Sequence, residues 1–157
     1  MIGFHRILVP TDFSPNARTA FHYAVSIGEK YGAELLIMHI VQDLALVLPD
    51  AVMPTPLPTP ATEQLIDTSK GMLEQFLKDE DTKGLTIRLD VRIGSPFHEI
   101  VAYAAEQKAD LIVMGSHGRS ALAHMFMGSV AEKVVRKARC AVLTVQHQFE
   151  EEEKHEG

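Results

Sequence analysis

The chain has 157 residues, which suits one domain with a single hydrophobic core. Its net charge is −6, and Glu150–Gly157, with five glutamates and one lysine, supplies −4 of that charge. The rest of the chain therefore carries only −2 and lacks the basic surface that a nucleic-acid partner needs. No uncharged apolar run approaches the roughly 18 residues of a membrane span, and the single cysteine, Cys140, excludes an internal disulfide.

The first part of the chain predicts two buried strands on either side of an amphipathic helix. Arg6–Pro10 is a short apolar run, and the chain enters it without the basic and apolar regions of a signal peptide. Together with the single cysteine, this start favours a cytoplasmic location. Helical spacing of apolar residues follows Ser14, an expected N-cap, and Pro15 at the first helical position. The helix is expected to end at Gly32, and Ala33–Val41 is near-continuously apolar, as in parallel sheets.

The middle of the chain predicts a loop, a second helix, an edge-like strand and a third helix. Alternating prolines forbid regular helix and predict an extended loop; they are Pro54, Pro56, Pro58 and Pro60. Leu65–Leu77 has the apolar spacing of an amphipathic helix. Leu85–Ile93 alternates strictly between apolar and polar residues, which predicts a strand with one wet face. Ser95 as N-cap and Pro96 at the next position begin the third helix.

The last part of the chain completes the alternation of strands and helices. Ala109–Gly115 is a further buried strand, the apolar residues Val130, Val134, Val135 and Ala138 mark a fourth helix, and Cys140–Gln146 is the final strand. The pattern predicts an α/β fold: a single-domain, open parallel five-stranded sheet, Rossmann-like or flavodoxin-like, with strand order 3-2-1-4-5 and helices on both faces. Residues 1–147 are expected to form this domain, and residues 148–157 an acidic disordered tail.

Three glycines surround the expected connection between the fourth strand and the fourth helix. In open α/β sheets, ligands bind beyond the carboxyl ends of the strands, where the loops after the first and fourth strands meet. Gly115 ends its strand where a backbone passes close to another group, and Gly118 either adopts a positive φ or presents its N–H group inward. Gly128 and Ser129 open a helix whose N–H groups attract anions, and Ser129 can cap the helix and donate to a phosphate.

This spacing predicts a phosphate cradle, although it matches neither of the two common glycine motifs. The chain has no Gly-Lys-Ser/Thr of a Walker A loop, and the spacing and position differ from the Rossmann Gly-x-Gly-x-x-Gly. The alternative is that the glycines only turn the chain. Asp12 has an alternative too, because an aspartate just before a helix often caps it, but Ser14 is the better-placed cap.

The arrangement Gly115-x2-Gly118-x9-Gly128-Ser129 resembles the ATP-binding signature of the universal stress protein family. The segments ILVPTDFS, GSPFHEI, ADLIVMGSHGRS and MGSVAEKVV are also typical of that family, and the resemblance covers nearly the whole chain. It implies an ATP site with adenosine at Pro10, Thr11 and Asp12, adenine against the backbone of Ile40, ribose beside Met114 and Gly115, phosphates on Gly118, Gly128, Ser129 and Val130, and a loop over residues 119–127 with Arg119 near the phosphates.

The expected function is therefore an ATP-binding regulatory or stress-response module. Any metal would be Mg²⁺ bridging the phosphates, because Mg²⁺ prefers oxygen ligands. One alternative is a slow ATPase or nucleotidyl-transfer enzyme, for which Asp12, His117 and Arg119 are the candidates, but the His-x-Gly-His and Ser-Gly-Gly-x-Asp-Ser signatures of related transferases are missing. The other is an interaction module that binds no nucleotide.

The final strand predicts a homodimer. In the expected strand order the third and fifth strands are the edges, and the third carries a polar or charged residue at every second position, which discourages pairing. Cys140–Val145 is apolar on both faces apart from Thr144, so it needs a cover. A second copy related by a two-fold axis would supply one, and the family resemblance implies the same. The alternative is that the tail from Gln146 onward folds back over the strand.

Overall fold

The computed structural model describes residues 1–42, 60–118 and 127–147. Pro54, Pro56 and Pro58 of the proline-rich segment, Arg119 and the acidic tail of residues 148–157 lie outside the described residues. The elements in chain order are β1 (Arg6–Pro10), α1 (Pro15–Tyr31), β2 (Glu34–Gln42), α2 (Pro60–Leu77), β3 (Ile87–Gly94), α3 (Pro96–Glu106), β4 (Leu111–Gly115), α4 (Ser129–Lys137) and β5 (Ala141–Val145). None of the described helices has the length and apolar character needed to cross a membrane.

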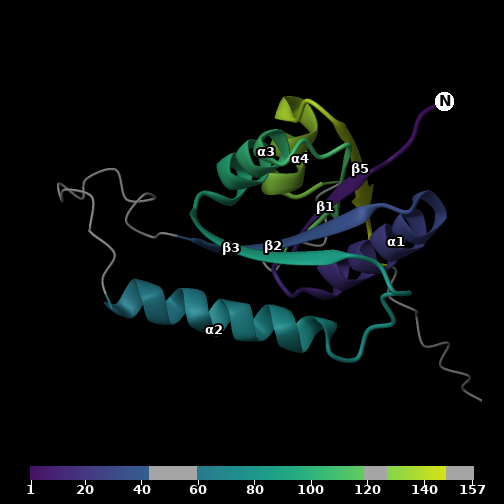
Figure 1. Ribbon diagram of the computed structural model, residues 1–157. Coiled ribbons are helices and arrows are strands. Elements are labelled where there is room, and N and C mark those ends of the chain that lie inside the picture. Colours follow the sequence, from purple (N-terminus) through teal and green to yellow (C-terminus); the bar gives the residue numbers. More distant parts are fainter. Residues whose placement is uncertain (43–59, 119–126, 148–157) are drawn as a thin grey trace, which may run out of the picture.

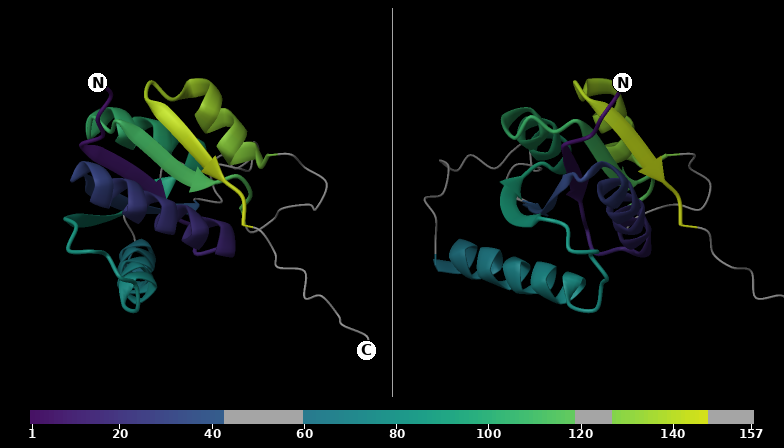
Figure 2. Two further views of the ribbon diagram at one scale, coloured as in Figure 1. Left: turned by 90° about the vertical axis from the view of Figure 1, so that its right-hand side faces the viewer. Right: turned by 45° about the vertical axis from the view of Figure 1, so that its right-hand side comes forward.

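The strands form one parallel five-stranded sheet in the order β3-β2-β1-β4-β5, which confirms the predicted fold and strand order. Helices α1 and α2 pack on one face, and α3 and α4 pack on the other (Figures 1 and 2). Right-handed crossovers explain this division, because the chain steps outward from β1 to β3 and then returns to the opposite side for β4 and β5. β1 and β4 are therefore the neighbours at which the strand order reverses.

The central strand β1 is buried on both faces, and each face has its own core. Ile7 and Val9 pack with Phe21 of α1, whereas Leu8 packs with residues of α3 and α4, and all four of these side chains are fully buried. The adjoining helix α1 has the predicted ends, because the Ser14 side chain accepts a hydrogen bond from the Ala17 N–H at 3.2 Å and a left-handed glycine, Gly32, ends the helix. Local chemistry thus fixes how the chain leaves β1 and returns to β2.

Several expected boundaries of elements are wrong. Helix α2 begins at Pro60 and not at Leu65, so Pro60 belongs to the helix and not to the proline-rich loop; proline is tolerated there because the first N–H groups of a helix have no carbonyl partner within it. β3 begins at Ile87 and not at Leu85, because a turn that is closed by a 3.0 Å hydrogen bond from the Leu85 N–H to the Thr82 carbonyl occupies the preceding residues. Ser95 is the N-cap of α3 as expected, but its side chain makes no capping hydrogen bond. In α4, the N-cap is Gly128 and Ser129 is the first helical residue.

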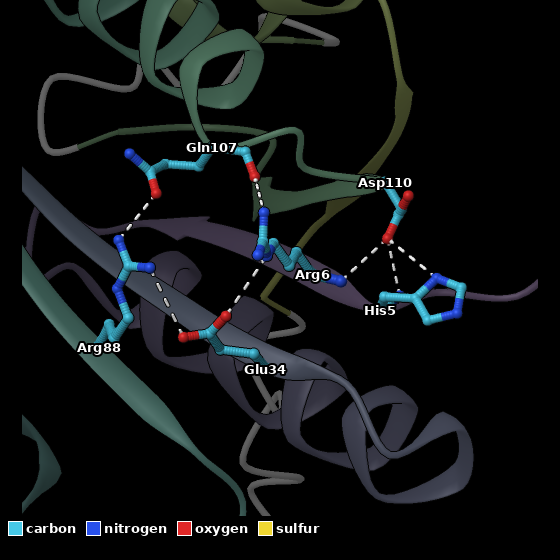
Figure 3. A network of polar contacts seen from close by, with 6 residues as sticks. All are labelled: His5, Arg6, Glu34, Arg88, Gln107 and Asp110. Carbon is cyan, nitrogen blue, oxygen red and sulfur yellow. Dashed lines mark hydrogen bonds and ion pairs between the residues drawn. The ribbon is translucent and has the colours of Figure 1, made fainter.

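A polar network joins the amino ends of the strands; it consists of His5, Arg6, Glu34, Arg88, Gln107 and Asp110 (Figure 3). The Glu34 carboxylate lies 3.5 Å from Nε of Arg6 and 3.7 Å from Nη1 of Arg88, so it bridges β1 and β3. Asp110 Oδ2 accepts the backbone N–H groups of His5 and Arg6 at 2.7 and 2.9 Å. Desolvation opposes ionisation of Asp110, but these two bonds and the charges of His5 and Arg6 outweigh it and lower the pKa of Asp110.

Candidate functional site

A cavity of about 290 Å³ lies at the opposite edge of the sheet, beyond the carboxyl ends of β1, β2 and β4 and beside the start of α4. Every predicted site residue that the structure describes lines it: Pro10, Thr11, Asp12, Ile40, Met114, Gly115, Gly118, Gly128, Ser129 and Val130. Arg119 lies outside the described residues. Segments from both halves of the chain therefore meet at one cavity, at the point where the strand order reverses.

The turn after β1 places Asp12 at the cavity. Thr11 is buried and its N–H donates to the Met38 carbonyl at 2.8 Å, which continues the β1–β2 ladder by one residue. The Asp12 carboxylate accepts the Ser14 N–H through Oδ1 at 3.0 Å, while Ser14 caps α1. Asp12 is thus not the N-cap, which leaves its Oδ2 side to face Gly118.

Phe13 has a φ of 64°, an unusual conformation for a bulky residue. Its ring packs 4.6 Å from the His39 ring and 6.0 Å from the Phe76 ring, measured between centroids. The His39 Nδ1 atom lies 2.8 Å from the Thr11 carbonyl, and because a carbonyl oxygen only accepts, Nδ1 carries the hydrogen. These contacts hold the backbone in a strained conformation, so that Asp12 lies at the cavity while Phe13 packs against His39 and Phe76.

The three glycines are required by close approaches of neighbouring groups. A Cβ atom at Gly115 would lie 2.9 Å from Asn16 Cβ and 3.2 Å from the Asn16 backbone carbon, so the first turn of α1 passes directly against the end of β4, as expected. Gly118 does not have a positive φ, which excludes the first of its two predicted roles. A Cβ atom there would lie 3.1 Å from Oδ2 of Asp12.

Gly128 closes the loop against the end of β4. Its N–H donates to the Ser116 carbonyl at 2.6 Å, and a Cβ atom on it would lie 3.1 Å from that same oxygen and 3.4 Å from His117 Cα. The Ser116 N–H in turn donates to the Val145 carbonyl at 2.8 Å. The start of α4 is thus fixed to the β4 loop, which is why the helix begins after Gly128 and not at it.

The amino terminus of α4 supplies donors to the cavity. The first helical bond runs from the Glu132 N–H to the Gly128 carbonyl at 3.0 Å, so the helix gives no carbonyl partner to the N–H groups of Ser129, Val130 and Ala131. All three residues line the cavity. N–H groups at a helix start, together with the positive end of the helix dipole, favour an anion.

The charges around the cavity are few. Among its described lining residues, Asp12 is the only carboxylate and none is lysine or arginine, while His39 and His117 are the titratable bases. The Ser116 hydroxyl lies 3.0 Å from Nδ1 of His117. In the described part of the chain, no group of three or more His, Cys, Asp or Glu side chains could hold a metal ion. Backbone dipoles are therefore the main protein groups for an anion.

Several lining residues were not predicted from the sequence: Ser14, Ala17, His39, Gln42, Pro96, Ile100, Ser116 and Ala131. His117, named above as an enzyme candidate, lines the cavity as well. Gln42 could have been found, because it is two residues after Ile40 at the carboxyl end of the same strand. Pro96 and Ile100 belong to α3, and only the packing of α3 beside β2 brings them to the cavity.

The geometry defines a doubly wound α/β domain with a glycine-lined cavity at its topological switch point. Residues 3–146 match the universal stress protein family. The chain is 32% identical over 143 residues to universal stress protein MJ0531 of Methanocaldococcus jannaschii, an alignment that covers 90% of this chain and 82% of that relative. The chain belongs to the universal stress protein family.

Two solved structures share this fold. Protein MJ0577 of Methanocaldococcus jannaschii has a TM-score of 0.79 at 26% identity, and the match covers 94% of this chain and 99% of that one. A universal stress protein in complex with cAMP has a TM-score of 0.65 at 26% identity, covering 92% of this chain and 98% of that one. Nucleotide binding thus occurs among the structural neighbours of this chain.

Proposed function

We propose that the cavity binds ATP and that the protein is a nucleotide-dependent regulatory module of the stress response, located in the cytoplasm. The observation that carries the proposal is the cradle formed by Gly118, Gly128 and the start of α4. There, the glycines leave room for a phosphate to come close to the backbone, and the first N–H groups of α4 have no carbonyl partner within the helix. The cAMP complex of a relative supports a nucleotide as the ligand. The lone cysteine supports the cytoplasm.

The proposed nucleotide extends from β2 to α4. Adenosine lies against Pro10, Thr11 and Asp12, with the adenine beside the backbone of Ile40, where strand β2 ends. The ribose lies beside Met114 and Gly115, and the phosphates lie on Gly118, Gly128, Ser129 and Val130. In this direction the negative charge reaches the positive end of the α4 dipole, whereas the uncharged base lies near Pro96 and Ile100 of α3.

The position of Asp12 supports Mg²⁺ as a companion of the phosphates. Its Oδ2 atom would lie 3.1 Å from a Cβ atom at Gly118, so a phosphate on Gly118 is close to a carboxylate and is repelled by it unless a cation lies between them. Mg²⁺ binds through carboxylate and phosphate oxygens and keeps several waters, so it does not require a full set of protein ligands. We expect Asp12→Asn to make ATP affinity less dependent on Mg²⁺, measured by calorimetry with and without the ion.

Efficient catalysis is not part of the proposal. No lysine or arginine lines the described cavity to stabilise a transferring phosphoryl group, and the Nδ1 atom of His117 already contacts the Ser116 hydroxyl. We expect ATP turnover well below the range of about 1–100 s⁻¹ that is typical of kinases. A steady-state rate inside that range, in a preparation free of contaminating ATPase, would favour the enzyme alternative.

The direct test is isothermal calorimetry of ATP with the wild type and with Gly118→Val. The added side chain enters the space beside Asp12 and blocks the approach of phosphate, so affinity should fall strongly while the fold is retained. Gly71→Val on α2 is a matched control, because a Cβ atom there meets nothing within 4 Å and the residue does not line the cavity. Equal affinity of wild type and Gly118→Val would refute the cradle. Native mass spectrometry of fresh protein would show whether a nucleotide co-purifies.

We also propose that β5 forms a homodimer with its copy. β5 is an edge of the sheet, and Ala141, Val142 and Leu143 are exposed or only half-buried in the single chain. Helix α4 packs against β5, and its Val135 is 45% exposed, which adds apolar surface near the same edge. An antiparallel pairing of the segment Cys140–Val145 with a second copy would cover this edge of the sheet. Of the tail from Gln146 onward that could fold back over β5 instead, residues 148–157 lie outside the described residues.

A further inference from the structure

The side chain of Asn16 bridges two loops that lie far from it in the sequence. Its Nδ2 group donates to the His117 carbonyl at 3.0 Å, and its Oδ1 accepts the His147 N–H at 2.7 Å, across separations of 101 and 131 residues. Because a carbonyl oxygen only accepts and a backbone N–H only donates, both contacts fix the same orientation of the amide. The asparagine amide donates to one loop and accepts from the other at the same time, which neither a carboxylate nor a hydroxyl can do with the same geometry.

The bridge is held in place from the β4 side as well. Asn16 lies in the first turn of α1, and a Cβ atom at Gly115 would lie 2.9 Å from its own Cβ. Glycine at position 115 therefore makes the room in which the Asn16 side chain reaches the β4 loop. The same glycine that the sequence suggests for nucleotide approach has this structural role in the described chain.

The His117 carbonyl is the part of the loop that controls the proposed phosphate donor. The oxygen of His117 and the N–H of Gly118 belong to one planar trans peptide, so they point in opposite directions and rotate together. By holding the oxygen, Asn16 sets the direction of the Gly118 N–H. The Gly118 nitrogen is close to Gly128, because a Cβ atom added to Gly128 would lie 3.7 Å from it.

The other half of the bridge reaches the segment that follows β5. His147 comes two residues after Val145, the last residue of the strand. The Val145 carbonyl accepts the Ser116 N–H at 2.8 Å, and the Nδ1 atom of His147 lies 2.9 Å from the Thr19 hydroxyl. The end of β5 and the β4 loop are thus connected both directly and through Asn16.

We propose that Asn16 is a positioning residue of the nucleotide site, which sets the Gly118 peptide plane and couples it to the end of β5. The proposal rests on ATP binding in the cavity as proposed above. A phosphate that binds the Gly118 N–H orders the His117–Gly118 peptide and so strengthens the bridge to His147. By reciprocity, a well-ordered end of β5 strengthens nucleotide binding by the same factor.

The test compares Asn16→Asp with Thr19→Val by NMR of the nucleotide-free protein and by calorimetry with ATP. The carboxylate of Asn16→Asp retains an acceptor for the His147 N–H but presents an oxygen to the His117 carbonyl. We expect the Gly118 amide resonance to shift, the hydrogen-exchange protection of the His147 amide to persist, and ATP affinity to fall about tenfold. An aspartate in the first turn is favoured by the helix dipole, so a general loss of stability is not expected to explain the change.

Thr19→Val is the matched control, because it is nearly isosteric and removes the contact with the His147 side chain and the 3.0 Å bond to the Pro15 carbonyl, but neither hydrogen bond of Asn16. It should leave the Gly118 resonance and ATP affinity unchanged. An unshifted Gly118 resonance in Asn16→Asp would overturn the proposal, and so would an equal loss of ATP affinity in Thr19→Val. If the wild type binds no ATP, the proposed function fails, while the nucleotide-free Gly118 resonance still decides the role of Asn16.

Discussion

Gly115 and Gly118 belong to one motif, yet the structure predicts opposite consequences for adding a methyl group to each. In Gly115→Ala, the new Cβ would lie 2.9 Å from Asn16 Cβ, closer than real Cβ atoms are found, and a tight 3.2 Å from the Asn16 backbone carbon. Neither neighbour can move easily, because Ser14 caps the first turn of α1 and β4 is paired on both sides. The substitution therefore forces a helix away from the sheet.

The magnitude follows from what each methyl group meets. Overpacking of a well-packed contact costs about 1–3 kcal/mol. For a domain of this size, about 1 kcal/mol corresponds to roughly 2–4 °C in Tm, so Gly115→Ala should lower Tm by about 2–12 °C. In Gly118→Ala the methyl group meets only Oδ2 of Asp12 at 3.1 Å, the end of a side chain that can rotate. Its effect on stability should remain within about 0.5 kcal/mol, but displacement of Asp12 should weaken ATP binding.

Thermal unfolding followed by circular dichroism measures the first effect, and calorimetry with ATP measures the second. Each variant serves as the control for the other, because both add one methyl group within the same short loop. A Tm of Gly115→Ala within 1 °C of the wild type, about a third of the change that one kcal/mol produces, would refute the argument from close approach. A Gly118→Ala variant as unstable as Gly115→Ala would refute the distinction between backbone and side-chain neighbours.

Three further predictions concern other parts of the fold. Folding lowers the pKa of Asp110, so the ionised carboxylate stabilises the folded state above its unfolded pKa of about 3.9, and this stabilisation is lost as pH falls. In urea at pH 7, Asp110→Asn should therefore be less stable than the wild type, and the difference in stability should close below about pH 4. Gly32→Ala, at a left-handed φ of 67° with no neighbour within 4 Å of the added Cβ, should cost about 1–2 kcal/mol by thermal unfolding. Val142→Lys with Leu143→Asp should abolish the proposed dimer in sedimentation velocity or cause aggregation, whereas an unchanged dimer would place the interface elsewhere.

The parts of the fold that local chemistry decides could be predicted from the sequence. Ser14 and Gly32 bound α1 because an N-cap hydroxyl and a left-handed glycine act on the residues beside them. The alternation of apolar strands with amphipathic helices predicts the parallel sheet with helices on both faces. The sequence also predicts that Gly128 and Ser129 open α4, but the hydrogen bond from the Gly128 N–H to the Ser116 carbonyl crosses a loop and cannot be predicted locally.

The candidate site was predictable to the extent that it consists of strand ends. Pro10–Asp12 and Met114–Gly115 follow buried strands, and the carboxyl ends of parallel strands meet at one edge of a sheet. Asn16 was not predictable, because it looks like an ordinary polar residue in the first turn of a helix. Its partners, His117 and His147, are known only once the loops have been placed.

The two edges of the sheet show why the cavity depends on backbone groups. At the amino ends of the strands, charged side chains such as Arg6, Glu34 and Arg88 satisfy one another across three strands (Figure 3). At the carboxyl ends, the described lining of the cavity has one carboxylate and no lysine or arginine. The anion that we propose there would meet N–H groups whose directions are set by neighbouring peptides, so its binding would depend on the geometry of the Gly118 and Gly128 loop more than on any single charge. For this reason a neutral side chain such as Asn16, which orients one peptide, can matter as much to the site as a residue that touches the ligand.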